Sequence, residues 1–310
     1  MLVLLAATRR RALPRRFVLA LTLVGCAPSA APEDGPEVLA RALEARPELA
    51  DAFVAKGQRP LHWAAEHDDE ETAAVLLAHG AAVDAADAEG RSALCVAARY
   101  DAPHVVSLLL DRQADVDASC DAFGDRPLHV AARYASAPLV QQLLRRANVD
   151  VTNHWGATAL HAVALRRDES DGALMALLAA KPSLEVMDRR GFTALHAAVV
   201  RDRARTVELL MDAGAEPNVR SRTGETPYQL ALASQADAVA TRLVERGAGG
   251  VEEPPLFVAA RTDDLPRLLA LLPYAHIDGV HAGQTALQLA EACHSERAAA
   301  ALRAHRWSAR

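Results

Sequence analysis

The sequence predicts an all-α fold in which about eight similar units stack as a solenoid, with short β-turn or hairpin fingers between them. Two observations predict it. A short motif recurs at nearly constant spacing through most of the 310 residues. Hydrophobic residues make up 51% of the chain but aromatic residues only 4%, which suits a core of Ala, Leu and Val between close helices. One such unit cannot bury its apolar face alone, so stacking supplies the core.

The motif is clearest in Thr193-Ala194-Leu195-His196. Its first position occurs eight times, at Arg59, Ser92, Arg126, Thr158, Thr193, Thr226, Pro254 and Thr285. Subtraction of these positions gives separations of 33, 34, 32, 35, 33, 28 and 31 residues. Eight matches in register predict a repeat array rather than a closed globule.

Each motif carries the signals of a helix start. Pro60 and Pro127 stand at the first helical position, where a missing N–H costs nothing. A Ser or Thr just before it, as at Thr226, supplies a hydroxyl that can cap the free N–H groups. A second apolar run follows and ends at glycines such as Gly80 and Gly214, where a left-handed residue closes a helix. We therefore expect two helices in each unit.

The pattern T-P-L-H-x-A at a period near 33 residues resembles the ankyrin repeat, a β-turn followed by two helices. The resemblance covers residues 36–307, with repeats starting near residues 55, 85, 118, 151, 187, 220, 251 and 279. It implies an ankyrin-repeat solenoid that acts through its surface, in a family without a common catalytic activity. It also implies that the motif histidines form hydrogen bonds near the turns and link neighbouring units. These histidines are His62, His129, His161 and His196.

Several stretches depart from the regular pattern. Residues 37–45 have apolar side chains at helical spacing and predict a half-repeat cap at the N-terminal end of the array. Residues 168–172 lengthen the turn within repeat 4. The 28-residue step after Thr226 leaves about five residues too few for a finger, so we expect a missing finger near residues 247–254. Arg297 and Arg303 give the last helix the polar outer face of a terminal cap.

Residues 1–25 resemble a signal peptide. Five arginines between Arg9 and Arg16 precede an apolar run at residues 17–24, a layout typical of export and short for a membrane span. Leu23-Val24-Gly25-Cys26 resembles a bacterial lipobox, which implies cleavage before Cys26 and lipidation of its thiol. Residues 26–35 then predict a flexible tether. An ordinary cleaved signal, an uncleaved anchor and a twin-arginine signal are the alternatives.

The cysteine spacing indicates neither a zinc site nor a disulfide framework. Cys95 occupies the histidine position of its motif and Cys293 falls in a terminal helix, so we expect both to be small core residues. Cys120 falls in a predicted loop, where its thiol can be exposed.

No set of residues predicts catalysis, a cofactor or a metal site. The motif histidines lie one repeat apart, so they cannot share one metal ion. Gly247-Ala248-Gly249-Gly250 is not followed by a helix start of the dinucleotide-binding type. The formal net charge of −6 gives no case for nucleic-acid binding. We therefore expect no enzymatic activity.

The positions that vary among ankyrin repeats are rich in Arg and aromatic residues here. These positions are the fingertips, the residue after the finger glycine and the two residues after the Ala-Ala pair. Arg, Tyr and Trp dominate protein interfaces because they combine large contact area with polar groups. The predicted protein-binding residues are Arg99, Tyr100, Phe123, Arg133, Tyr134, Trp155, Arg166, Arg190, Phe192 and Arg201. They predict a partner with an acidic or aromatic-rich segment; the alternative is solvated arginines and aromatic side chains that only cover seams between repeats.

Together these features predict a non-catalytic protein–protein interaction module that is exported and lipid-anchored in the bacterial envelope, facing the periplasm. We expect a monomer that acts on another envelope protein as a scaffold, an inhibitor or a protective partner. The alternative is a soluble cytoplasmic ankyrin-repeat regulator or inhibitor whose first residues are not a signal. The sequence does not name the partner, because a fold alone does not determine function.

Overall fold

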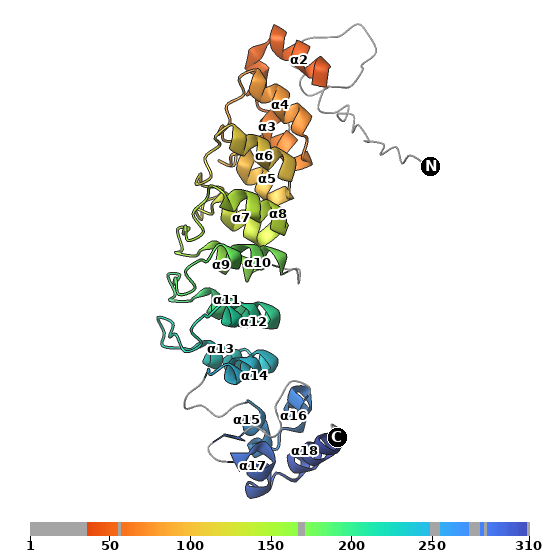
Figure 1. The fold of residues 1–310 in the computed structure, drawn as a ribbon, viewed down its shortest axis with the longest axis vertical. Helices are drawn as coiled ribbons and strands as arrows, with labels where there is room; N and C mark the ends of the chain where they lie inside the picture. Colours follow the sequence, from red (N-terminus) through yellow and green to blue (C-terminus); the bar gives the residue numbers. More distant parts are fainter. Residues whose placement is uncertain are drawn as a thin grey trace, which may run out of the picture. The chain divides into compact units, whose positions relative to one another are not determined.

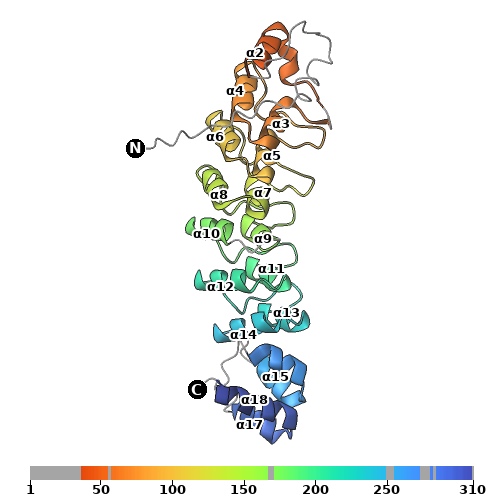
Figure 2. The same cartoon turned by 90° about the vertical axis from the view of Figure 1, so that its right-hand side faces the viewer.

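The computed structural model describes residues 36–54, 57–166, 171–248, 255–272, 280–281 and 284–308. Contacts divide the chain between Ala147 and Asn148 into two units, each described separately. Both units consist of successive helix pairs joined by turns (Figures 1 and 2), which confirms the predicted all-α repeat fold. The predicted signal peptide, the tether and Cys26 lie outside the described residues, as do residues 168–170 of the lengthened turn and residues 249–254 of the expected missing finger.

The first unit begins with a half-repeat and continues with three full helix pairs. Its elements are α2 (Pro36–Ala45), the 3-10 helix η1 (Pro47–Ala50), α3 (Pro60–His67), α4 (Glu70–Ala78), α5 (Ala93–Tyr100), α6 (Pro103–Asp111), α7 (Pro127–Tyr134) and α8 (Ala137–Leu144). The first helices of the pairs form one row, α3 on α5 and α5 on α7. The second helices form another row, in which α2 packs on α4, α4 on α6 and α6 on α8. The half-repeat thus covers the end of the second row.

The second unit contains five further pairs. Its elements are α9 (Ala159–Val163), α10 (Gly172–Ala179), α11 (Ala194–Val200), α12 (Ala204–Asp212), α13 (Pro227–Ala233), α14 (Asp237–Glu245), α15 (Pro255–Thr262), α16 (Leu265–Leu271), β1 (Val280–His281), β2 (Gln284–Thr285), α17 (Ala286–Ala292) and α18 (Glu296–Ser308). Strands β1 and β2 pair antiparallel as the finger of the last repeat. Helix α14 packs against both α15 and α16, and the side chain of Arg267 on α16 forms an ion pair with Asp237 on α14 at 2.7 Å. The described part of repeat 7 is therefore packed onto repeat 6.

The motif explains both the core and the helix starts. Its third position is buried in seven successive repeats, at Leu61, Leu94, Leu128, Leu160, Leu195, Tyr228 and Leu256. The Ser92 hydroxyl accepts the Cys95 N–H at 3.3 Å, and the Thr226 hydroxyl accepts the Gln229 N–H at 3.3 Å, as predicted for helix caps. Gly80 has a φ of 90°, which fits its predicted role at a helix end.

Two motif histidines link neighbouring repeats as expected. The Nε2 atom of His62 lies 2.7 Å from the Arg91 carbonyl oxygen in the next finger. The Nε2 atom of His161 lies 2.9 Å from the Phe192 carbonyl oxygen in the same relation. Burial lowers the pKa of His62, because the interior disfavours the charged imidazolium. These side chains link neighbouring repeats. The described residues contain no cluster of three or more His, Cys, Asp or Glu that could hold a metal ion.

A second link between repeats was not visible in the sequence. The aspartates that end the first helix of a pair adopt the left-handed conformation, with φ of 51° at Asp68 and 54° at Asp101. The Asp68 carboxylate accepts the N–H groups of His104 and Val105 at the start of α6, both at 3.0 Å. Asp101 accepts the Ser136 N–H at the start of α8 at 2.9 Å. Each aspartate therefore caps the second helix of the following repeat.

The C-terminal helix pair bears on two expectations, the burial of Cys293 and the polar outer face of the last helix. Cys293, expected in the core, is exposed, because it lies just beyond the last turn of α17. Arg297 and Arg303 lie on the exposed side of α18, consistent with a polar terminal cap. Among the described residues, no helix has both the length and the apolar character that a membrane span requires.

Candidate protein-binding surface

The finger turns hold the tip residues in fixed positions. In the finger turns of repeats 2 to 5 a side-chain oxygen of the first residue accepts two backbone N–H groups: Asp121 accepts those of Phe123 and Asp125, at 2.9 and 3.0 Å. Asn153 accepts the Trp155 N–H at 2.9 Å in the same way. A glycine with positive φ follows each tip, as at Gly156 with a φ of 75°. The tip side chains point outward as a result, and Phe123 is 56% and Trp155 53% exposed.

In the first unit, an Arg–Tyr–Arg cluster forms at the C-terminal ends of α5 and α7. The guanidinium carbon of Arg99 lies 4.5 Å from the centre of the Tyr134 ring, and that of Arg133 lies 5.4 Å from it. Within the described residues, neither guanidinium forms an ion pair with a carboxylate. Tyr100 and Tyr134 are 49% and 43% exposed. The cluster is therefore an exposed cationic and aromatic patch that no carboxylate of the described residues neutralises.

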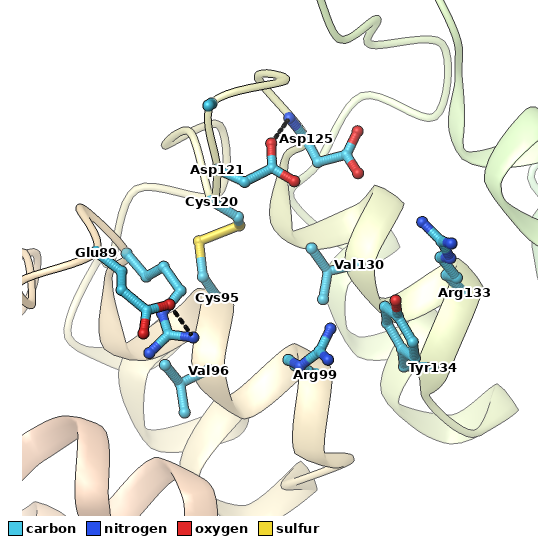
Figure 3. A pocket seen from close by; sticks show the side chains of 12 residues that line it. Glu89, Cys95, Val96, Arg99, Cys120, Asp121, Asp125, Val130, Arg133 and Tyr134 are labelled. Atoms are coloured by element: carbon cyan, nitrogen blue, oxygen red, sulfur yellow. Dashed lines mark hydrogen bonds and ion pairs between the residues drawn. A yellow bond between two sulfur atoms is a disulfide. The ribbon is translucent and has the colours of Figure 1, made fainter. Parts of the chain in front are cut away.

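The cluster borders a pocket of about 330 Å³, which we call the disulfide pocket. Figure 3 shows the bond between Cys95 and Cys120 between two sets of charged residues. The finger side carries Asp121, Asp125 and the ion-paired Glu89 and Arg91. The side of the helix ends carries Arg99, Arg133 and Tyr134, and the apolar lining residues are Val96 and Val130. The pocket is thus acidic toward the fingers, basic toward the helix ends and apolar in the middle.

The disulfide corrects the prediction for these cysteines. Cys120 is not an exposed thiol but is 4% exposed and bonded to Cys95, 25 residues earlier. Cys95 is buried as expected, yet not as a free core thiol. Its position in the motif is the one from which His62 and His161 reach the next finger. The disulfide therefore replaces that hydrogen bond between repeats 2 and 3, a relation that simple cysteine spacing did not reveal.

In the second unit, two aromatic side chains that contact arginines belong to fingers: Trp155, which is exposed, and Phe192, which is half-buried. The guanidinium carbon of Arg189 lies 5.8 Å from the Trp155 ring centre, and that of Arg190 lies 4.5 Å from the Phe192 ring centre. The Arg189 N–H donates to the Trp155 carbonyl oxygen at 2.8 Å, so neighbouring fingers are joined directly. Phe192 stacks on the ring of His196 with centroids 5.3 Å apart. The structure thus brings Trp155, Arg190 and Phe192 together on adjacent fingers, with Arg189 as a contact residue that the prediction left out.

One predicted member of the surface is wrong. Arg166 is only 8% exposed, because α9 ends at Val163 and the chain turns before the position that Tyr100 and Tyr134 occupy in their helices. Arg201, in contrast, is exposed just after α11. Tyr100 and Phe123 are exposed but do not line the disulfide pocket.

Comparison with known proteins agrees with this architecture. The family model of ankyrin repeats (3 copies) matches residues 29–120, 128–221 and 170–253. The structure resembles the crystal structure of an ankyrin repeat domain from Acinetobacter baumannii AYE, with 30% sequence identity, 61% of this chain and 98% of that chain covered, and a TM-score of 0.52. No curated protein matches the sequence. Ankyrin repeats are protein–protein interaction modules, and this chain belongs to the ankyrin repeat family.

Proposed function

We propose that this protein is a non-catalytic binding module that holds a protein partner through its exposed Arg and aromatic clusters. The observation that carries the proposal is the pairing of guanidinium groups with exposed rings in both units. At exposed sites such a pair is worth about 0.5–1 kcal/mol, so the side chains are partly ordered before a partner arrives. Less side-chain entropy is then lost on binding, which favours affinity.

The polarity of the clusters fits a partner with an acidic or aromatic-rich segment. Arg99 and Arg133 provide positive charge that is not neutralised by ion pairs within the described residues, and Trp155 and Tyr134 provide aromatic faces. Arg, Tyr and Trp are the residue types that most often carry binding energy in protein interfaces.

The experiment is a comparison of partner affinity among single variants. A partner captured from an envelope extract with the wild-type protein is purified, and its affinity is measured for Tyr134→Ala, Trp155→Ala and the control Met175→Ala. Met175 is also a large exposed side chain, but it lies on α10 and outside both clusters. We expect losses of about tenfold or more for the two aromatic variants and little change for the control. Unchanged affinity in folded Tyr134→Ala and Trp155→Ala proteins would exclude the proposal.

We further propose that the protein is exported and anchored by a lipid on Cys26 in the bacterial envelope. The arginine-rich start, the apolar run and the Leu23-Val24-Gly25-Cys26 sequence support this location. The Cys95–Cys120 disulfide supports it independently, because disulfides persist in oxidising compartments such as the periplasm and are rare in the cytosol.

Membrane fractionation tests the location. Wild type should sediment with membranes, and Cys26→Ser should not carry the lipid and should lose stable membrane association. Wild type that remains in the soluble cytoplasmic fraction would favour a cytoplasmic regulator instead. Cys293→Ser is the matched control, since it removes an exposed cysteine far along the chain and should leave the fractionation unchanged.

A further inference from the structure

We propose that the disulfide pocket binds an acidic side chain of the partner protein and that the Cys95–Cys120 bond keeps the pocket able to do so. The inference rests on the proposed binding function. It specifies that one residue of the partner that enters the pocket is acidic. It also specifies that binding of this residue depends on the Cys95–Cys120 disulfide.

The basic end of the pocket is built to receive a carboxylate. Arg99 and Arg133 approach the same Tyr134 ring, and neither is engaged by a carboxylate of the described chain. The third arginine of the pocket differs, because Arg91 forms ion pairs with Asp87 at 2.8 Å and Glu89 at 2.9 Å. A guanidinium binds a carboxylate through two parallel hydrogen bonds, which gives both strength and orientation. Arg99 and Arg133 are therefore the two cations available to a partner.

The opposite end of the pocket fixes the direction of binding. Asp121 and Asp125 lie on the finger side and disfavour a second carboxylate there, whereas the charge of Glu89 is balanced by its ion pair with Arg91. Val96, Val130 and the disulfide form an apolar middle that suits a hydrophobic neighbour of the acidic residue. A volume of about 330 Å³ is at the small end of ligand pockets, which fits one or two side chains rather than a large molecule.

The disulfide determines how the finger side of the pocket is held. Cys120 precedes Asp121 in the finger, and its bond to Cys95 ties this finger to α5. In repeats 1 and 4 a histidine holds the next finger by a hydrogen bond. A Cys95 thiol is only a weak donor and cannot replace that bond. Reduction by a dithiol adds two electrons and two protons, breaks the S–S bond to give two thiols and closes the dithiol to a cyclic disulfide. The finger then loses its tie to α5, and the pocket loses its shape.

The test of the acidic anchor uses short random peptides displayed on phage and selected on the immobilised full-length protein. Selected peptides are synthesised with a fluorescent label, each beside a variant in which Asp or Glu becomes Asn or Gln. We expect the acidic residue to recur, and its amide variant to bind wild type about tenfold more weakly or worse. Arg99→Gln with Arg133→Gln should abolish this difference. Arg145→Gln with Arg146→Gln, at exposed arginines that follow α8, should preserve it.

The test of the disulfide uses the same peptides before and after reduction with dithiothreitol. Wild type should lose about tenfold or more in affinity on reduction, as should Cys95→Ser with Cys120→Ser. Cys95→His with Cys120→Ala restores the histidine of the other repeats, so its binding should not respond to the reductant. Circular dichroism of each variant shows whether it is folded, and reduction of wild type provides the same test without a substitution.

The outcomes separate this inference from the proposed function. Peptides that bind through the aromatic clusters without an acidic preference would overturn the anchor and leave the binding module intact. An acidic preference that survives reduction would overturn the part assigned to the disulfide. Failure to select any peptide that Tyr134→Ala or Trp155→Ala weakens would count against both.

Discussion

The link from repeat 2 to repeat 3 in the first unit and the link from repeat 4 to repeat 5 in the second unit use different chemistry at the same position of the motif. In the first unit Cys95 is bonded covalently to Cys120 of the next finger. In the second unit the corresponding residue, His161, makes a hydrogen bond of 2.9 Å to the Phe192 carbonyl oxygen. The position thus requires a link to the next finger but does not determine its chemistry. The disulfide is broken by reduction but is not affected by protonation. The buried histidine is not affected by reduction, but its hydrogen bond is sensitive to protonation of the ring.

The aromatic side chains near the disulfide pocket and those of the second unit that contact arginines lie on different elements, although the first unit also has the exposed fingertip Phe123. Tyr100 and Tyr134 lie at the ends of helices α5 and α7, beside the disulfide pocket. Trp155 and Phe192 lie on fingers, where turns rather than helices hold them. The first unit therefore offers a small concave pocket and the second offers the projecting ring of Trp155, two surfaces that suit different parts of a partner.

The largest effect is expected from removal of the covalent link. Cys95→Ser with Cys120→Ser should lower the free energy of unfolding of the first unit by about 3 kcal/mol, because the bond closes a loop of 25 residues in the unfolded chain. Chemical denaturation without reductant, with hydrogen exchange to assign the loss to α5–α7, measures it. Reduced wild type should match the variant, and a loss below about 1 kcal/mol would contradict the prediction.

A smaller loss is expected from the hydrogen-bonded link. His161→Ala should cost about 2 kcal/mol, since it leaves the buried Thr158 N–H and the Phe192 carbonyl oxygen without their partner. The double variant His161→Cys with Met187→Cys compares the two kinds of link directly. It places two cysteines at the positions that correspond to Cys95 and Cys120. Under oxidising conditions this variant should lose two free thiols and recover most of the stability. Two thiols that remain free would show that the two fingers are not interchangeable.

A third prediction separates two reasons why a finger position requires glycine: a backbone with positive φ and close contact with the next finger. Gly191→Ala places a Cβ only 2.4 Å from the Arg222 nitrogen of the next finger, in addition to the strain of a φ of 76°. Gly224→Ala has comparable strain at 86° but no heavy atom within 4 Å of the new Cβ. We expect Gly191→Ala to be about 1 kcal/mol more destabilising than Gly224→Ala in thermal or chemical unfolding. Equal losses would mean that finger-to-finger contact does not constrain this turn.

The smallest effect is the response to acid. Burial lowers the pKa of His62 and of His196 below the ordinary value of 6.5, so their contribution to stability is present above pH 6.5 and is lost as the pH falls through their folded values. The exposed His104 has the opposite sign, because its hydrogen bond to Asp68 raises its pKa and stabilises the fold mainly below pH 6.5. Measurements of unfolding against pH in a His104→Gln background isolate the buried pair. Hydrogen exchange should show acid sensitivity around the buried His62 and His196 and little around Cys95.

Much of the fold could be predicted because the motif repeats its own signals. The number and order of helix pairs follow from three kinds of signal: proline and hydroxyl residues at the helix starts, Leu195 and its counterparts in the core, and glycines at the helix ends. Arg99 and Tyr134 could be placed on the surface because they follow the Ala-Ala pair at a constant register. Arg166 was misplaced because register alone does not show that α9 ends early.

The disulfide could not be predicted from spacing, because its two cysteines lie in different repeats and meet only through the stack. One signal was nevertheless present: Cys95 stands where other repeats have histidine, and that histidine contacts the next finger, which contains Cys120. The caps supplied by Asp68 and Asp101 were missed for a related reason. Their partners lie 36 and 35 residues further along the chain, beyond any local pattern.

Those aspartates have a consequence for how such an array can change length. The second helix of repeat 2 and that of repeat 3 each receive an N-terminal cap from the repeat before it, and Asp263 does the same for Ala298 at 2.8 Å near the C-terminal end. In a repeat separated from its neighbours, the aspartate carboxylate would have no helix to cap, and the N–H groups at the start of the second helix would have no cap. Where a repeat carries such an aspartate, deletion or duplication of one whole period rejoins an equivalent donor and acceptor, so selection can lengthen or shorten the protein in complete repeats without a new kind of junction. Repeat 3, which has Ala135 at this position, lacks that carboxylate.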